Sequence, residues 1–260
     1  MIRVAAVGDI HLGPDSAGVL RPAFDTLRDS ADLLLLAGDL TRHGTVEEGR
    51  VVAGEVAGLG LPVVAVLGNH DYQSDQEAEI TEALEDAGVT VLEKAATVLD
   101  IRGVRVGIAG TKGFGGGFAG RSGGEFGEPE MKEFIRYTRR CADGLRSSLE
   151  SLRDAECAVR IALTHYSPVP DTLAGEPLEI YPFLGSYLLA EAVDGAGADL
   201  VVHGHAHMGT EHGMTSEGVR VRNVAQPVIG RAFAVYHLPV PAAGERAASG
   251  AVTGAGARSA

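Results

Sequence analysis

Cysteine is scarce in this sequence, since only Cys141 and Cys157 occur among its 260 residues. Their spacing is not that of a C-x-x-C metal or redox motif, so the sequence predicts neither a thiolate zinc site nor a disulfide framework. We interpret both residues as free thiols. Free thiols favour a reducing compartment, and we therefore expect a cytoplasmic protein.

Positively charged residues and long apolar runs are also scarce in this sequence. The chain has 22 Lys and Arg against 35 Asp and Glu, which gives a net charge of −13. This balance disfavours non-specific attraction to nucleic acid or to an anionic membrane, because both depend on clustered cations. No apolar run approaches the ~20 residues that a membrane-spanning helix needs, and residues 3–7 are predicted to be a core strand rather than part of a secretory signal. We expect neither nucleic acid nor membrane as a partner, and the oligomeric state stays open.

The rest of the composition is that of a globular protein. Hydrophobic residues make up 45% of the chain and charged residues 22%, and 260 residues suffice for one large domain with a sizeable core. We predict a single domain over residues 1–240. After Pro241 only Ala, Gly, Ser and a few charged or β-branched residues remain, so we predict that residues 241–260 are a disordered Ala- and Gly-rich tail.

The first third of the chain alternates apolar strands with amphipathic segments. Residues 32–37 are continuously apolar after Asp32, which indicates a strand buried on both faces. Thr45 followed by Glu48 forms a capping box that opens a helix. Helical spacing of apolar residues predicts two further helices, over residues 19–29 and 76–87.

The remainder of the chain is predicted to be mixed. Residues 97–100 and 104–109 flank Gly103 as a hairpin, and Pro129 begins a helix with an apolar stripe that reaches Leu152. Residues 110–127 hold nine glycines, and we interpret their formal G-x-G-x-x-G match as chance because no helix opens there. The other predicted segments are a proline-rich loop or lid over residues 167–182, a helix over 184–193, a strand over 199–203, and a closing antiparallel run over 209–214, 219–223 and 232–238 that completes a second sheet.

Five apolar runs of the sequence end in Asp, Asn or His. Because polar residues directly after buried strands lie at the carboxyl edge of a sheet, we expect these side chains to lie close together. A group made only of these three residue types predicts a polynuclear metal site. The clusters are Asp9 with His11, then Asp39, then Asn69 with His70 and Asp71, then His165, and last His205 with His207.

The order of these clusters resembles that of the calcineurin-like metallophosphoesterases. The blocks are Asp9-Ile10-His11, Gly38-Asp39, Gly68-Asn69-His70-Asp71, His165 and Gly204-His205-Ala206-His207, and they span roughly residues 1–235. This ordered set of five is far more specific than any one block. The resemblance implies an α/β (α+β) fold of four layers, in which two mixed sheets pack face to face with helices outside.

The resemblance also implies a ligand set for two divalent transition metal ions. Asp39 would bridge the ions, with Asp9, His11 and His207 on one and Asn69, His165 and His205 on the other. Imidazole with carboxylate and amide oxygen suits manganese, iron, zinc, cobalt or nickel better than calcium, and among these we favour manganese.

His70 has no metal assigned to it, and in the resembling family it is the general acid. An imidazole suits this task because its pKa lies near working pH, and we expect Asp71 to orient the ring or stabilise its cation. Arg42 and His43 follow Asp39 and could meet a phosphate oxygen. We interpret His203 as buried structure and His212 and His237 as strand residues, and Asn223 lies where many relatives carry a Gly- and Ser-containing turn.

These residues predict a metal-dependent phosphoesterase that hydrolyses a small phosphomonoester or phosphodiester by in-line attack of hydroxide held by two metal ions. One alternative is a non-catalytic metal-binding scaffold, but relatives of that kind have lost the acid histidine. The other alternative is a nuclease, which would need a cationic groove. One face of the helix that begins at Pro129 carries Arg136, Arg139, Arg140 and Arg146. The simplest interpretation is that this face is exposed to solvent.

Overall fold

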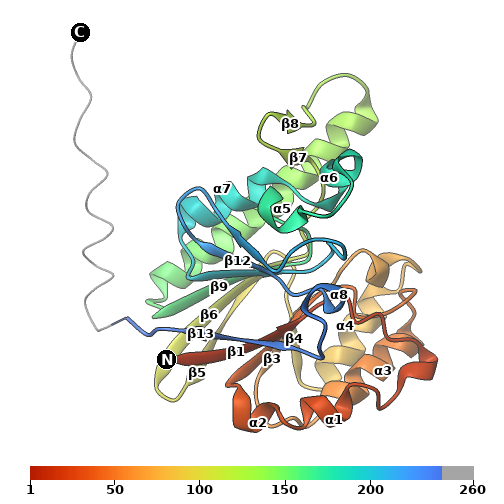
Figure 1. The fold of residues 1–260 in the computed structure, drawn as a ribbon, viewed down its shortest axis with the longest axis vertical. Coiled ribbons are helices and arrows are strands. Elements are labelled where there is room, and N and C mark those ends of the chain that lie inside the picture. The colour runs from red at the N-terminus through yellow and green to blue at the C-terminus, as the bar shows by residue number, and fades with distance from the viewer. Residues whose placement is uncertain (242–260) are drawn as a thin grey trace.

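The computed structural model describes residues 1–241, so the predicted tail lies outside the described residues except for Pro241. Figure 1 shows two large mixed sheets with helices on their outer sides, which confirms the predicted four-layer architecture. One sheet has five strands and the other has six. No helix among residues 1–241 is long and apolar enough to cross a membrane.

The first sheet has the order β13-β1-β2-β3-β4, and its strands are parallel except for β13, which runs antiparallel to β1. Alternate side chains of its strands point to opposite faces, so the continuous apolar runs are buried on both sides. One face packs against four helices. The strands are β1 (Ile2–Val7), β2 (Leu33–Ala37), β3 (Val63–Val66), β4 (Val89–Val91) and β13 (Ala234–Leu238), and the helices are α1 (Arg21–Phe24), α2 (Leu27–Ser30), α3 (Val46–Val56) and α4 (Glu77–Asp86).

The second sheet has the order β11-β12-β10-β9-β6-β5, and two helices cover its outer face (Figure 1). Its inner face packs against the first sheet through a shared hydrophobic core. The strands are β5 (Ala95–Ile101), β6 (Val104–Thr111), β9 (Val159–Thr164), β10 (Leu200–His203), β11 (His212–Met214) and β12 (Arg220–Asn223), and the helices are α5 (Pro129–Asp154) and α7 (Tyr187–Ala196).

Shorter elements connect these layers. The glycine-rich segment contains a two-stranded pair, β7 (Gly117–Phe118) with β8 (Arg121–Ser122), which the sequence analysis did not predict. The proline-rich segment contains single helical turns and α6 (Tyr181–Leu184) rather than regular structure throughout. The last short helix is α8 (Gln226–Ile229).

The predicted helix over residues 19–29 is wrong in one respect, because the structure has two short helices there. Leu20, Phe24 and Leu27 are buried at helical spacing, as expected. The chain turns between the two helices, where the Thr26 hydroxyl donates a hydrogen bond to the Ala23 carbonyl. A local side-chain bond of this kind competes with helix continuation.

The predicted closing antiparallel run is right for β11 and β12, which pair antiparallel in the second sheet, but wrong for its other pairings. β12 runs parallel to β10, and β13 leaves the second sheet to pair with β1 in the first. The segment between them crosses from one sheet to the other where the Gly8 amide donates to the Val224 carbonyl. The helix predicted over residues 184–193 begins later, because Gly185 is extended and Ser186 caps α7 by accepting a hydrogen bond from the Leu188 amide.

Candidate metal centre

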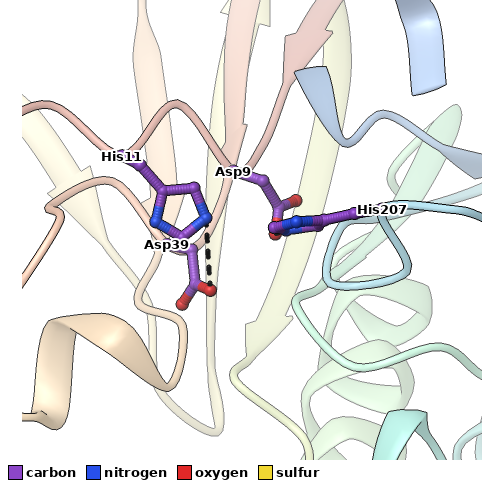
Figure 2. A group of neighbouring side chains, drawn as sticks. All are labelled: Asp9, His11, Asp39 and His207. Atoms are coloured by element: carbon purple, nitrogen blue, oxygen red, sulfur yellow. Dashed lines mark hydrogen bonds and ion pairs between the residues drawn. The ribbon is translucent and has the colours of Figure 1, made fainter. Parts of the chain in front are cut away.

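The predicted ligand residues follow the carboxyl ends of β1, β2, β3, β9 and β10. The sequence analysis expected one sheet edge, whereas the first three strands belong to one sheet and the last two to the other. The edges of the two sheets meet, and all seven predicted ligands come together there. Figure 2 shows four of them, Asp9, His11, Asp39 and His207, with their polar ends turned toward one another.

The backbone of this region adopts an uncommon conformation. Asp9, His11, Asp39 and His205 have positive φ values of 55°, 41°, 50° and 70°. Residues other than glycine rarely adopt left-handed backbone angles, because the Cβ atom then crowds the carbonyl. Four of the eight such residues in the described chain are predicted metal ligands, so backbone strain is concentrated at this site.

Two glycines allow the loops to approach closely. A Cβ atom on Gly68 would overlap the Asp39 carboxylate, and one on Gly204 would overlap Oδ2 of Asp9. A side chain at either position would therefore push apart loops from different strands. The glycine before Asn69 and the glycine before His205 are required for the site to close.

One candidate ligand group consists of Asp9, His11, Asp39 and His207, whose ligand atoms all lie within 4.8 Å of one another. Oδ1 of Asp9 lies 2.8 Å from Nε2 of His207. Nε2 of His11 lies 3.8 Å from Oδ2 of Asp39, and it is buried without a hydrogen-bond partner among residues 1–241. Because buried polar atoms nearly always have a partner, this nitrogen fits a site that a cation completes.

The second candidate group consists of Asp39, His165 and His205, with Asn69 beside them. Nδ1 of the buried His165 lies 2.9 Å from the Ala37 carbonyl, which can only accept, so this nitrogen carries the proton. Nε2 of His165 therefore directs a lone pair toward Oδ1 of Asn69 at 3.0 Å and Oδ1 of Asp39 at 3.3 Å. Three electron-rich atoms that face one another fit a shared metal ion.

Asp39 is common to both groups. Its Oδ2 faces His11 and its Oδ1 faces His165, while the side chain is almost completely buried. A carboxylate with one oxygen in each group has the geometry that a bridging ligand needs. The bridging role stays a prediction.

Burial favours the neutral forms of Asp9, His165 and His205 at this site. Loss of hydration raises the pKa of Asp9 to about 6 and lowers the pKa of His165 and His205, the latter to about 3. The hydrogen bond to Asp9 raises the pKa of His207. Neutral imidazole is the form that binds metal, so the histidines buried here are ready to act as ligands.

His70 lies at the open side of the centre. Its Nδ1 lies 2.9 Å from the Arg42 carbonyl and therefore donates to it, which leaves Nε2 available to the site. Nε2 lies 4.0 Å from Oδ2 of Asp39, and the side chain is 40% exposed. The His70 amide also donates to Oδ1 of Asp39 at 2.8 Å. The Nδ1 side of the ring is thus held by the backbone, and the Nε2 side is accessible.

The prediction that Asp71 orients the His70 ring is wrong. The Asp71 side chain is fully buried, and the Arg42 carbonyl holds the ring instead. The Asp71 carboxylate ties together the loops after β2 and β3, and burial raises its pKa to about 6. Its four donors are the backbone amides of Leu40, Thr41 and Gly68 and the Thr41 hydroxyl.

Other residues noted in the sequence lie outside the ligand groups. The Arg42 guanidinium pairs with Asp15 at 3.0 Å, and the His43 side chain is exposed. His203 is buried and hydrogen-bonded to Thr172, which confirms it as buried structure. Asn223 is buried and donates to the Ala206 carbonyl at 2.8 Å, so it supports the loop that carries His205 and His207.

Lys112 is a residue that sequence reasoning did not assign to the site. It follows β6, and its carbonyl accepts hydrogen bonds from the amides of His165 and Tyr166. Its buried ammonium lies 5.0–5.5 Å from the centres of four aromatic rings. Its position in the sequence could have indicated a role, because Lys112 follows a strand end as the predicted ligands do. It was not chosen because lysine is not a metal ligand. The rings belong to Tyr72, Phe114, Tyr137 and Tyr166.

Comparison with known proteins identifies relatives of this chain. The sequence profile of the calcineurin-like phosphoesterases matches residues 2–209. A Synechococcus protein named a probable cyclic nucleotide phosphodiesterase is 35% identical over 89 residues, which cover 30% of this chain and 34% of that protein. The chain thus matches about a third of the length of this curated relative.

Two solved structures share the fold. A phosphopantetheinyl hydrolase from Mycobacterium tuberculosis superposes with a TM-score of 0.61 and 18% identity, over 85% of this chain and 88% of that chain. The protein TT1561 of Thermus thermophilus superposes with a TM-score of 0.54 and 19% identity, over 86% and 89% of the two chains. At these identities the likeness shows the fold alone.

We expect purified protein to bind about two transition metal ions per chain, and Asp39→Asn to lose at least one, because the amide removes charge from the shared ligand. Metal content measured by elemental analysis checks this expectation. Asp86→Asn, on the exposed side of α4, is the matched control and should keep full occupancy. Full occupancy in Asp39→Asn would overturn the bridging role.

Metal should stabilise the fold more at neutral than at acidic pH. Because burial raises the folded pKa of Asp9 to about 6 from 3.8, ionising this group costs metal-free protein stability as the pH rises between these values. A cation beside the carboxylate removes that loss. The increase in unfolding temperature on adding manganese should therefore be larger at about pH 7.5 than at about pH 5. Equal increases at both values would contradict a metal bound by Asp9.

Proposed function

This chain belongs to the calcineurin-like phosphoesterase family, and we propose that it is a metal-dependent enzyme that hydrolyses a small phosphomonoester or phosphodiester. The observation that carries this proposal is the buried Asp39 carboxylate, which has one oxygen in each of two candidate ligand groups. Such an arrangement suits a pair of divalent transition metal ions, with manganese favoured over iron, zinc, cobalt or nickel.

Metal ions bound at these residues would supply charge that neutralises a phosphate and acidifies water. The chain's own residues then have separate tasks. Asp39 holds the two ligand groups together, and Asp71 fixes the loops that carry Asp39 and Asn69. The buried imidazoles of His165 and His205 stay neutral, because burial lowers their pKa values. The site is therefore arranged to attract an anionic phosphate only when cations are present.

His70 is suited to deliver a proton to the leaving group. The Arg42 carbonyl accepts the Nδ1 proton, so the exchangeable proton resides on Nε2, at the accessible side of the ring. No metal group includes this nitrogen. A protonated Nε2 at the rim of the phosphate site can donate to an alkoxide as the ester bond breaks.

Nucleotides are the substrate class that we favour among small esters. The partial relative from Synechococcus is named a probable cyclic nucleotide phosphodiesterase, and its match supports a phosphate ester of this size. The net charge of −13 disfavours a long polyanion. Arg136 and Arg139 pair with Glu125, and Arg140 pairs with Glu133, so much of the arginine face of α5 is already neutralised. We also propose a cytoplasmic location, on the grounds of two buried free thiols.

A non-catalytic scaffold is the second candidate. The presence and orientation of His70 favour catalysis over this role, because a scaffold has no need of an accessible imidazole beside its metal ligands. Hydrolysis of any ester that depends on His70 would exclude the scaffold.

His70→Gln should retain metal and lower the rate of hydrolysis by ~10²–10⁴-fold, as expected for the loss of a general acid. The loss should be smaller for nitrophenyl esters, because nitrophenolate needs little protonation. Initial rates on alkyl and nitrophenyl esters check this difference, and His237→Gln, at an exposed position of β13, is the control. Equal losses for both leaving groups would remove His70 from the acid role.

Small esters should be hydrolysed faster than single- or double-stranded DNA or RNA. The physical reason is that the acidic chain repels a long polyanion, most strongly at low ionic strength. Initial rates on small esters and on the polymers, measured at low salt, test this. Faster turnover of the polymers that weakens steeply as salt rises would reveal a cationic groove and favour a nuclease.

A further inference from the structure

The His205 ring is held by a backbone carbonyl of α6. Its Nε2 lies 3.2 Å from the carbonyl oxygen of Phe183, which can only accept a hydrogen bond, so Nε2 carries the ring proton. In the neutral ring the lone pair is then on Nδ1. His205 belongs to the candidate group of Asp39 and His165, and Nδ1 is therefore the atom that it offers to this group.

Two backbone hydrogen bonds join the glycine-rich segment to α6 and the residue after it. The Gly116 amide donates to the Pro182 carbonyl at 2.6 Å, and the Gly117 amide donates to the Gly185 carbonyl at 2.9 Å. Phe183 lies between these two acceptors in the chain. The glycine-rich segment therefore fixes the backbone on each side of the carbonyl that holds His205.

Gly115 allows this approach because it has no side chain. A Cβ atom on Gly115 would lie 2.5 Å from the Pro182 carbonyl oxygen and 3.2 Å from Cα of Phe183. Both are backbone atoms, so a side chain here would displace the peptide between Pro182 and Phe183. The Thr138 hydroxyl holds Gly115 in place by donating to its carbonyl at 2.6 Å. Contacts thus run without interruption from α5 through Gly115 and Phe183 to His205.

We propose that the glycine-rich segment is a positioning element for metal binding. It sets the Phe183 carbonyl, and this carbonyl holds His205 with Nδ1 directed to the group of Asp39 and His165. The inference rests on the metal centre of the proposed function, but not on hydrolysis. Histidine ligands commonly donate their second ring N–H to a carbonyl, and loss of such a partner typically lowers metal affinity by about 10–100-fold. The same segment supports His165, whose amide donates to the Lys112 carbonyl.

Zinc binding to the full chain, measured by calorimetry, tests this role. We expect Gly115→Ala to weaken one of two zinc sites by ~10-fold or more, because the added methyl group displaces the Phe183 carbonyl. The site that lacks His205 should keep its affinity. Gly124→Ala is the matched control, since Gly124 is exposed and a Cβ atom there would meet no atom within 4 Å. It should bind zinc as the unmodified chain does.

Thr138 provides a second variant that adds no bulk beside Phe183. Thr138→Val removes the hydrogen bond to Gly115 and should weaken the same zinc site, although by less than Gly115→Ala. Thr138→Ser keeps the hydroxyl and should restore the affinity. Unfolding temperatures without zinc are measured alongside. A purely structural role would lower these temperatures and leave both zinc affinities of the folded variants unchanged.

Nitrogen-15 NMR of the zinc-loaded chain reports the His205 ring directly, and His205→Gln identifies its signals. Nε2 should carry the proton, and this proton should exchange with water faster in Gly115→Ala, because its acceptor has moved. A proton on Nδ1 would overturn the proposal, and so would zinc affinities that are equal in the unmodified chain and the folded Gly115 and Thr138 variants.

The outcome for hydrolysis is separate. Selective loss of one zinc site in Gly115→Ala, in a chain that hydrolyses no ester, would support the positioning role and overturn only the proposed enzyme activity. An active enzyme whose zinc affinities do not respond to these variants would overturn the positioning role alone. An unmodified chain that binds no zinc would overturn both the metal centre and this role.

Discussion

The burial of two carboxylates among imidazoles is the constraint on which the rest of the structure depends. Asp9 and Asp39 are almost fully buried, and the charge of Asp39 adds to the rise in the pKa of Asp9. Like charges in a desolvated space are costly unless a cation or hydrogen-bond donors compensate them. Backbone amides of His70 and His205 supply part of that compensation. The metal ions that we propose for this site would supply the remainder.

Part of the free-energy cost of this arrangement is backbone strain in the loops that follow the strands. Left-handed angles at Asp9, Asp39 and His205 turn the chain sharply enough to aim each side chain inward. Such angles persist only where the surroundings hold them, and here the surroundings are the two packed sheets beneath. Asp71 adds a direct brace between two of the loops. Rigid strands and strained loops together fix the positions of the site's side chains.

The second sheet contributes more than ligands. Lys112 directly follows the strand β6. Its carbonyl accepts hydrogen bonds from the backbone after β9, and its ammonium contacts aromatic rings from four segments. The glycine-rich segment after Lys112 has little side-chain bulk, so α5 and the segment of Phe183 can approach it closely. The segments around Lys112 therefore support the backbone that carries His165.

The sequence by itself determined most of the strands and the residue types that follow them, because buried runs and their polar ends are local patterns. The order of those polar residues carried the resemblance that gave the family and the fold class. The predicted helix over residues 19–29 is divided in two near Thr26, whose hydroxyl donates a hydrogen bond to the Ala23 carbonyl. Only the tertiary structure decided that β13 joins the first sheet, that the Arg42 carbonyl rather than Asp71 holds His70, and that Lys112 lies against Tyr166. These contacts join residues distant in the chain, and spacing along the sequence carries no information about which loop closes over which.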